Sequence, residues 1–228
     1  MMCECGGSFM EIKSNGLKFR IENKKASVIG FDVLSKHLLI PPEIQGIPIS
    51  SIEKYAFSHS ELKEVQIPSS ISELGNGAFS DCHELKMFSV YDSNLSKNNT
   101  LRIRNQVFWN CCSLEKIKAP NMFLTIDSHG LAHCESLLEI VSIIKTLKGI
   151  SLIGCDSLLY LIFDNGASIE DVSIADLPNL QSIAFKGNAD IASIVLKLMR
   201  DKGVKITCPS TSNLVNLVYS GFNIVTID

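Results

Sequence analysis

"LKEVQIPSSISELGNGAFSDCHELKMFSV", residues 62–90, contains one full copy of a unit that recurs along the chain. Its alanine–phenylalanine pair ends at Phe79, and a leucine follows at Leu85. The corresponding anchor residues of the six units are Phe57, Phe79, Phe108, Leu131, Leu152 and Ile174, with spacings of 22, 29, 23, 21 and 22 residues. Such a period is typical of a solenoid, in which each repeat forms one coil.

Three further positions of the unit are apolar in every copy. An aliphatic residue lies five positions before each anchor: Ile52, Leu74, Ile103, Ile126, Leu147 and Ile169. A leucine lies five or six positions after it: Leu62, Leu85, Leu114, Leu137, Leu158 and Leu180. Another apolar residue follows three positions later: Val65, Phe88, Ile117, Ile140, Leu161 and Ile183. The four columns predict one core shared by stacked coils, because a single coil cannot bury its own apolar face.

Each unit also contains two short strand patterns, one before the anchor and one after the repeat leucine. In the second pattern Val65 and Ile67 alternate with polar residues, as expected for a strand with one buried side. Stacking predicts parallel pairing of equivalent strands at about 4.8 Å. The one long spacing locates a polar insertion near residues 92–99, which carries glycosylation sequons at Asn94 and Asn98.

Residues 62–90 resemble the leucine-rich repeat of the BspA-like surface proteins, whose units read roughly L-x-x-I-x-I-P, then I-G-x-x-A-F-x-x-C-x-x-L. The likeness extends over about residues 17–228, because 17–57 is similar to the β-hairpin segment that precedes such arrays and 205–228 to the way they finish. It is most specific in the first three repeats. The resemblance implies a right-handed leucine-rich solenoid with parallel stacked strands, and a role in adhesion or other protein binding.

We therefore expect a single leucine-rich repeat domain over residues 1–228. Its expected parts are a flexible N-terminus (about 1–16), a β-hairpin segment (17–48), six repeats (49–185) with the insertion, and an α/β C-terminal cap (186–228). In the cap, an apolar stripe predicts a helix within 188–203 that ends at Gly203: Ile191, Ile194, Val195 and Leu198. A strand at 204–207, a short helix starting near 210–212 and a strand at 222–227 should complete it.

Four cysteines occupy the same position of the unit, three residues before the repeat leucine: Cys82, Cys111, Cys134 and Cys155. We interpret this position as a small buried slot, whose thiol can donate to a backbone carbonyl at the bend. Zinc binding through Cys82-His83 and His133-Cys134 is the alternative, but these pairs lie two coils apart, at about 10 Å. We expect a structural ladder of reduced thiols and no metal site.

Other chemically active side chains do not form a known signature. Cys112 is expected to face outward and is the better candidate for a reactive thiol. Cys3 and Cys5 are interpreted as part of a tail without function, with metal binding or mutual pairing as alternatives. Trp109 should pack beneath the insertion or serve an interface. The five histidines lie at turns of different coils: His37, His59, His83, His129 and His133. We expect no catalysis and no cofactor.

The composition and the first residues of the sequence limit which classes of partner and which cellular location we expect. The 228 residues are 46% hydrophobic and 20% charged, with a formal charge of −3, which does not suggest nucleic acid. Apolar runs are too short for membrane insertion. The first residues lack the basic start and apolar core of a secretory signal, so the sequence as written predicts a cytoplasmic protein with unpaired thiols. A cell-surface or secreted location follows if the family likeness holds and a leader is missing.

The surface of the strands after the repeat leucines is the predicted partner-binding face. Its outward residues in units three to five are Lys116, Lys118, Glu139, Val141, Tyr160 and Ile162. Val141, Tyr160 and Ile162, with Leu138 and Leu159 at the bends, form either an exposed apolar strip or core that the cap covers. We expect a non-catalytic, adhesion-type module for a protein or peptide. The alternatives are a self-assembling homo-oligomer and, third, a metal-binding or enzymatic role of the cysteines.

Overall fold

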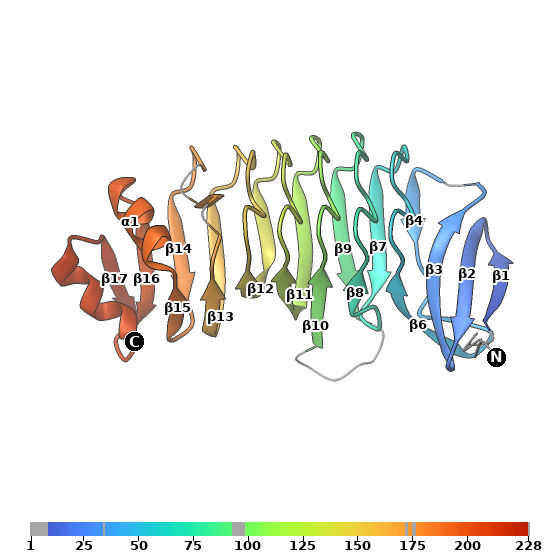
Figure 1. Cartoon of the computed structure of the whole chain (residues 1–228), viewed down its shortest axis with the longest axis horizontal. Coiled ribbons are helices and arrows are strands. Elements are labelled where there is room, and N and C mark those ends of the chain that lie inside the picture. Colours follow the sequence, from blue (N-terminus) through green and yellow to red (C-terminus); the bar gives the residue numbers. More distant parts are fainter. Residues whose placement is uncertain (1–8, 34, 93–98, 172, 175–176, 228) are drawn as a thin grey trace, which may run out of the picture.

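The computed structural model describes residues 9–33, 35–92, 99–171, 173–174 and 177–227. The side chains of Leu198 and Tyr219 are also outside this description, as is most of the predicted insertion. The chain is a β-solenoid in which two rows of strands face each other across one core (Figure 1).

The first row contains the strands that follow the repeat leucines, together with β4 at one end and β16 and β17 at the other, all paired in parallel. In spatial order they are β4 (His37–Leu39), β7 (Glu64–Pro68), β9 (Met87–Tyr91), β11 (Lys116–Ile126), β12 (Glu139–Leu147), β13 (Tyr160–Ile169), β14 (Ser182–Phe185), β16 (Lys205–Pro209) and β17 (Ile224–Ile227). Strands β11, β12 and β13 are long because they pass through the corner of the coil and continue into the second row.

The second row contains the strands that precede the anchors. Its members are β3 (Lys25–Phe31), β6 (Ile47–Ile52), β8 (Glu73–Leu74), β10 (Asn99–Ile103), the later parts of β11, β12 and β13, and β15 (Ala189–Ile191). A two-residue strand, β5 (Glu43–Ile44), pairs antiparallel with β6.

The N-terminal end of the solenoid is closed by antiparallel strands. Strand β1 (Met10–Ser14) pairs with β2 (Leu17–Glu22), and β2 pairs with β3, so the second row gains a β-meander at this end (Figure 1). The prediction of a flexible segment over residues 1–16 is therefore wrong for Met10–Ser14. Its alternating pattern is weak because both faces of β1 are largely solvated, so pairing with β2 is what holds it in place.

The core follows the four apolar columns of the sequence. All 24 residues of these columns are buried, and the most exposed of them, Leu180, retains only 8% of its accessible surface. Phe57, Phe79 and Phe108 stack face to face, with ring centroids 5.2 and 5.5 Å apart. Phe31 of β3 extends the stack towards the N-terminus, with its ring centroid 5.9 Å from that of Phe57, and the stack ends at Phe108 because later anchors are leucine or isoleucine.

The bends after the anchors have a fixed backbone conformation. The residue two positions after the anchor is left-handed in four successive coils: His59, Asp81, Asn110 and His133, with φ between 57° and 60°. Anchor amides donate to the next coil: Phe57 N to Ala78 O (2.8 Å), Phe79 N to Val107 O (2.9 Å), Phe108 N to Gly130 O (2.9 Å) and Leu131 N to Ser151 O (3.0 Å). These bonds satisfy backbone donors that burial would otherwise leave unpaired.

The C-terminal cap agrees with the prediction except in its first part. Residues 189–191 form β15, which pairs with β13, because the second row continues for one more coil before the helix begins. Helix α1 (Ser193–Asp201) buries Val195 and Met199, four positions apart, whereas Ile194 is 51% exposed. Of the predicted stripe, Val195 is buried as expected, Ile194 is exposed, and Ile191 is buried in β15 before the helix begins.

The remaining parts of the cap lie where the sequence places them. Gly203 ends the helix with φ +66°, and its amide donates to Arg200 O at 2.9 Å. Strand β16 follows, and the 3₁₀-helix η2 (Asn213–Ser220) begins at Ser212, whose Oγ accepts from Leu214 N at 3.2 Å. Strand β17 then adds the last strand to the first row.

Candidate partner-binding face

The structure brings the six predicted face residues together on three neighbouring strands of the first row. They occupy equivalent places: Lys116 and Lys118 on β11, Glu139 and Val141 on β12, and Tyr160 and Ile162 on β13. Each is half-buried and alternates with a fully buried core residue, so its side chain lies on the outer surface of the sheet.

Three of these side chains are joined across the coils. The ammonium group of Lys116 pairs with one carboxylate oxygen of Glu139, directly opposite in the register. The hydroxyl of Tyr160 donates to the other oxygen, Oε2. The Lys116 and Glu139 side chains are 34% and 22% exposed, so this contact is partly shielded from water. It fixes the Tyr160 ring on the surface of the sheet.

The apolar part of the face lies beside this contact. Val141 is opposite Lys118 in the register, and Ile162 occupies the equivalent position in the next coil. At the neighbouring bend Leu138 is 46% exposed. The C-terminal cap does not cross over these residues: β14 pairs with β13 through Tyr160↔Ser182, and β16 pairs with β14 through Ser182↔Lys205. The cap thus extends the row and leaves the strip half-exposed.

Sequence reasoning missed the connection between Lys116, Glu139 and Tyr160. A usable signal was present, because all three lie two positions after their repeat leucines. Parallel in-register stacking places such residues side by side, and a lysine next to a glutamate in one column predicts an ion pair.

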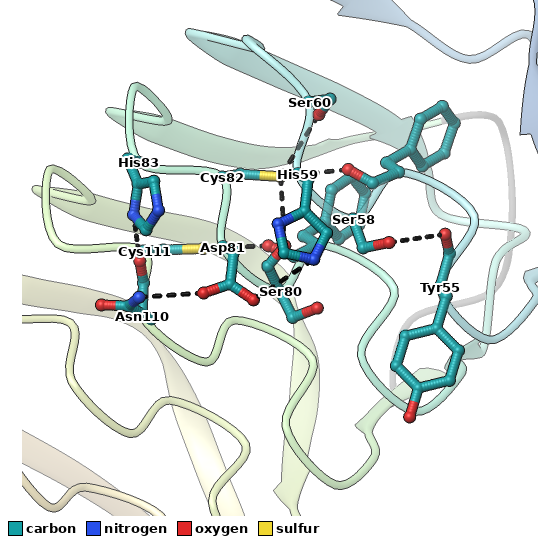
Figure 2. A network of polar contacts seen from close by, with 12 residues as sticks. Tyr55, Ser58, His59, Ser60, Ser80, Asp81, Cys82, His83, Asn110 and Cys111 are labelled. Carbon is teal, nitrogen blue, oxygen red and sulfur yellow. Dashed lines mark hydrogen bonds and ion pairs between the residues drawn. The ribbon is translucent and has the colours of Figure 1, made fainter.

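The four predicted ladder cysteines are fully buried and make the same contact in every coil. Each thiol lies against the anchor carbonyl of the preceding coil: Cys82 to Phe57 O (3.1 Å), Cys111 to Phe79 O (3.1 Å), Cys134 to Phe108 O (3.2 Å) and Cys155 to Leu131 O (3.1 Å). A carbonyl accepts, so each sulfur keeps its proton and donates. The contacts of Cys82 and Cys111 are drawn in Figure 2.

The pKa shifts of the two middle cysteines of the ladder, Cys111 and Cys134, favour the protonated thiol. Burial raises the pKa of Cys111 and of Cys134 well above the usual thiol value. A hydrogen bond with the Cys111 thiol lowers the pKa of Cys82, at the N-terminal end of the ladder. In the described parts of the chain, no three histidine, cysteine or acidic side chains are grouped so as to hold a metal ion. Cys3 and Cys5 lie outside the described residues.

The bends carry a second, polar ladder on their outer side (Figure 2). Asn110 Nδ2 donates to Asp81 Oδ1 at 2.9 Å, and His59 Nε2 lies 3.7 Å from the other oxygen of Asp81. His83 Nδ1 is 3.1 Å from the carbonyl of Asn110, which can only accept, so this nitrogen carries the proton. The same nitrogen is therefore not a base for Cys112, whose sulfur lies 3.9 Å away.

Trp109 packs within this edge of the molecule. Its ring lies edge-on against His133, with centroids 4.7 Å apart, and tilted against His129 at 5.6 Å. It is half-buried. Both contacts come from the next coil, and most of the predicted insertion lies outside the described residues.

Stacked parallel strands, leucines at the inner corner and a repeat of about 22 residues define this class of protein as a leucine-rich repeat solenoid. The profile of the BspA type leucine rich repeat region matches residues 43–156 and 91–202, with six copies. The chain belongs to this family, as the repeat of residues 62–90 predicted. No curated protein matches the chain at the sequence level.

Two solved structures share the fold. A leucine-rich repeat protein of T. pallidum is 17% identical, with a TM-score of 0.55 over 86% of this chain and 98% of that one. A leucine-rich cell surface protein of Faecalibacterium prausnitzii A2-165 is 19% identical, with a TM-score of 0.54 over 90% of this chain and 56% of that one. At these identities the likeness concerns the fold. No helix in the described residues has the length and apolarity needed to span a membrane.

Proposed function

We propose that this protein is a non-catalytic binding module that holds a protein or peptide partner against the first row, at the face formed by Lys116, Lys118, Glu139, Val141, Tyr160 and Ile162. The observation that carries the proposal is the tyrosine held by Glu139 beside half-exposed aliphatic side chains. A fixed aromatic ring loses little conformational entropy on binding, and tyrosine is favoured at the energetic centre of interfaces.

The test uses two matched substitutions of tyrosine by glutamate. Tyr160→Glu places a second carboxylate beside Glu139, whereas Tyr55→Glu changes a 57% exposed tyrosine at a bend, away from the face. Immobilised wild type and both variants are incubated with the same protein extract, and retained proteins are identified by mass spectrometry and purified. We expect a partner that binds wild type and Tyr55→Glu alike and Tyr160→Glu at least tenfold more weakly. A partner insensitive to Tyr160→Glu would place binding elsewhere.

Self-association is the second candidate, and the distribution of exposed apolar side chains favours it. Among the described residues, four large ones lie near the N-terminal end (Phe9, Met10, Val33 and Leu39) and four in the cap (Ile194, Val218, Val225 and Ile227). Only Tyr55 and Leu138 lie between them. Exposed apolar side chains are thus concentrated at the two ends of the solenoid, and exposed apolar surface that is contiguous usually marks an interface.

Light scattering across a range of protein concentrations tests this candidate. A mass that rises with concentration, and returns to the monomer value in Val225→Lys combined with Ile227→Lys, supports association through the cap. A constant monomer mass excludes it.

We further propose that the protein acts at the cell surface. Membership of a family of surface-protein repeats supports this location, as does the similar fold of the F. prausnitzii cell surface protein. Protease treatment of intact source cells should remove the protein while cytoplasmic markers stay intact. Protection until lysis would contradict the proposal.

A further inference from the structure

The charges on the first row are distributed unevenly along the solenoid. From β11 to the cap, the outward charged residues of this row are three lysines and two acidic residues: Lys116, Lys118, Lys205, Glu139 and, beyond Ile162 on β13, Asp164. The whole chain carries a formal charge of −3. This half of the face is therefore locally basic on an acidic protein.

Only part of this positive charge is compensated by neighbours. Glu139 uses both carboxylate oxygens, one for Lys116 and the other for Tyr160. Lys118 and Lys205 have no ion pair within the described residues. Uncharged residues lie next to these lysines in the sheet register: Ser89 and Val141 flank Lys118, and Ser182 lies beside Lys205.

The two uncompensated lysines lie on opposite sides of the apolar strip. Lys118 precedes Val141 and Ile162 along the row, and Lys205 follows Tyr160 after the small residue Ser182. Coils stack at about 4.8 Å, so β11 and β16 are separated by about 19 Å. An extended peptide covers that distance with about six residues, at about 3.4 Å each.

This arrangement resembles the anatomy of a binding site, with an apolar centre and a charged rim. Carboxylates on the partner would be paired with Lys118 and Lys205, while apolar side chains between them would cover Tyr160 and Ile162. Complementary charge raises the association rate and selects the partner, and the apolar contacts supply most of the affinity.

Building on the proposed function, we propose that the partner at this face is an extended, acidic protein segment with apolar residues between two acidic positions about six residues apart. Charge complementarity at Lys118 and Lys205, on either side of the strip, selects this class over neutral or basic segments. The segment lies across the strands, along the row.

The experiment uses random twelve-residue peptides displayed on phage as the probe. Wild-type protein is the bait, and enriched sequences are synthesised and measured by fluorescence polarisation. We expect enriched peptides to combine acidic and apolar residues. Lys118→Glu and Lys205→Glu should each weaken their binding by about tenfold, and added salt should weaken wild-type binding. Lys24→Glu, an exposed charge reversal in the β2–β3 turn, is the matched control and should leave affinity unchanged.

The outcomes separate this inference from the proposed function. Peptides that lose affinity with Tyr160→Glu but not with either lysine reversal would support the proposed binding face. The same result would overturn the inference that this face prefers acidic segments. Peptides insensitive to all three variants, or no enrichment at all, would count against both. Lysine-dependent binding of heparin without enrichment of any peptide would overturn the peptide class in favour of an acidic polysaccharide.

Discussion

The bends of the first four coils and the junction of the fifth coil with the sixth satisfy their buried backbone amides by different means. In the early coils, anchor amides donate to backbone carbonyls of the next coil and cysteine thiols donate to anchor carbonyls. The amide of Leu152, the fifth anchor, donates instead to the hydroxyl of Ser173 in the sixth coil, at 3.0 Å. Side chains there take over the role of the backbone ladder.

The substitute is a buried carboxylate. Asp171 accepts four hydrogen bonds, from the amides and hydroxyls of Ser151 and Ser173. The two amide contacts measure 2.8 and 2.7 Å, and all three residues are fully buried. Ser151 and Ser173 stand where earlier units have Ala56, Ala78, Val107 and Gly130. A repeat can thus depart from the consensus sequence where a side chain accepts from buried backbone amides that have no carbonyl partner in the neighbouring coil.

A similar replacement occurs at the opposite corner of the last coils. Asn165 Oδ1 accepts from Asn188 N at 2.9 Å, and Asn188 Oδ1 accepts from Asn213 N at 2.9 Å. Gly187 makes room for the first of these side chains, because a Cβ there would lie 2.3 Å from Asn165 Oδ1. The asparagine ladder is thus a feature of the C-terminal third, whereas stacked anchor rings occur in the N-terminal half.

The largest expected effect comes from breaking the aromatic stack. Phe79→Ala removes the ring between Phe57 and Phe108 and should lower the free energy of unfolding by about 3–5 kcal/mol. Urea denaturation followed by circular dichroism measures this loss. A loss below about 1 kcal/mol would show that the stack does not stabilise the early coils.

Removal of the buried carboxylate should have the next largest effect. Asp171→Ala leaves the buried amides of Ser151 and Ser173 without a partner, and we expect a loss of about 2–4 kcal/mol in the same measurement. Asp171→Asn keeps one acceptor oxygen and should lose less. Asp164→Ala, at a half-exposed aspartate, is the control and should change stability by under about 0.5 kcal/mol. Equal losses in the first and third variants would contradict the role of Asp171.

The cysteine ladder should contribute less per residue. Cys134→Ala removes one thiol–carbonyl contact and leaves a small cavity, so we expect a loss of about 1 kcal/mol. Cys112→Ala, at the half-exposed neighbour position, should be neutral within about 0.5 kcal/mol.

In a background with Cys3→Ser and Cys5→Ser, a thiol reagent should modify Cys112 in the folded protein and the ladder only after unfolding. Rapid labelling of all ladder thiols would contradict their burial.

The smallest effect concerns pH. Burial raises the pKa of Asp171 from 3.8, and the hydrogen bonds from the serines oppose this shift only in part. The folded state therefore binds this proton more tightly than the unfolded state. The resulting stabilisation is complete below pH 3.8 and is lost as pH rises through the raised value.

Wild type should accordingly lose stability relative to Asp171→Asn as the pH increases across this window. Urea midpoints at several pH values between about 3.5 and 7 measure the difference. A difference that is constant with pH would show that the carboxyl does not titrate differently on folding.

The sequence by itself determined the repeat period, the four buried columns, the slot of the cysteines and the family. These features depend on residues within one unit and recur along the six units, so the repetition makes them recognisable from the sequence. Stacking then places equivalent residues side by side, which is why the outward positions of Lys116, Glu139 and Tyr160 could be predicted.

Only the tertiary structure decided features that depend on contacts between particular coils. The Asp171 cluster, the asparagine ladder and the contact of Tyr160 with Glu139 each join side chains from different repeats, and one repeat's pattern does not contain them. The predicted helical stripe in the cap was wrong for Ile191 and Ile194 for the same reason. Ala189–Ile191 has a helix-compatible spacing, but the open edge of β13 provides hydrogen bonds that make it a strand.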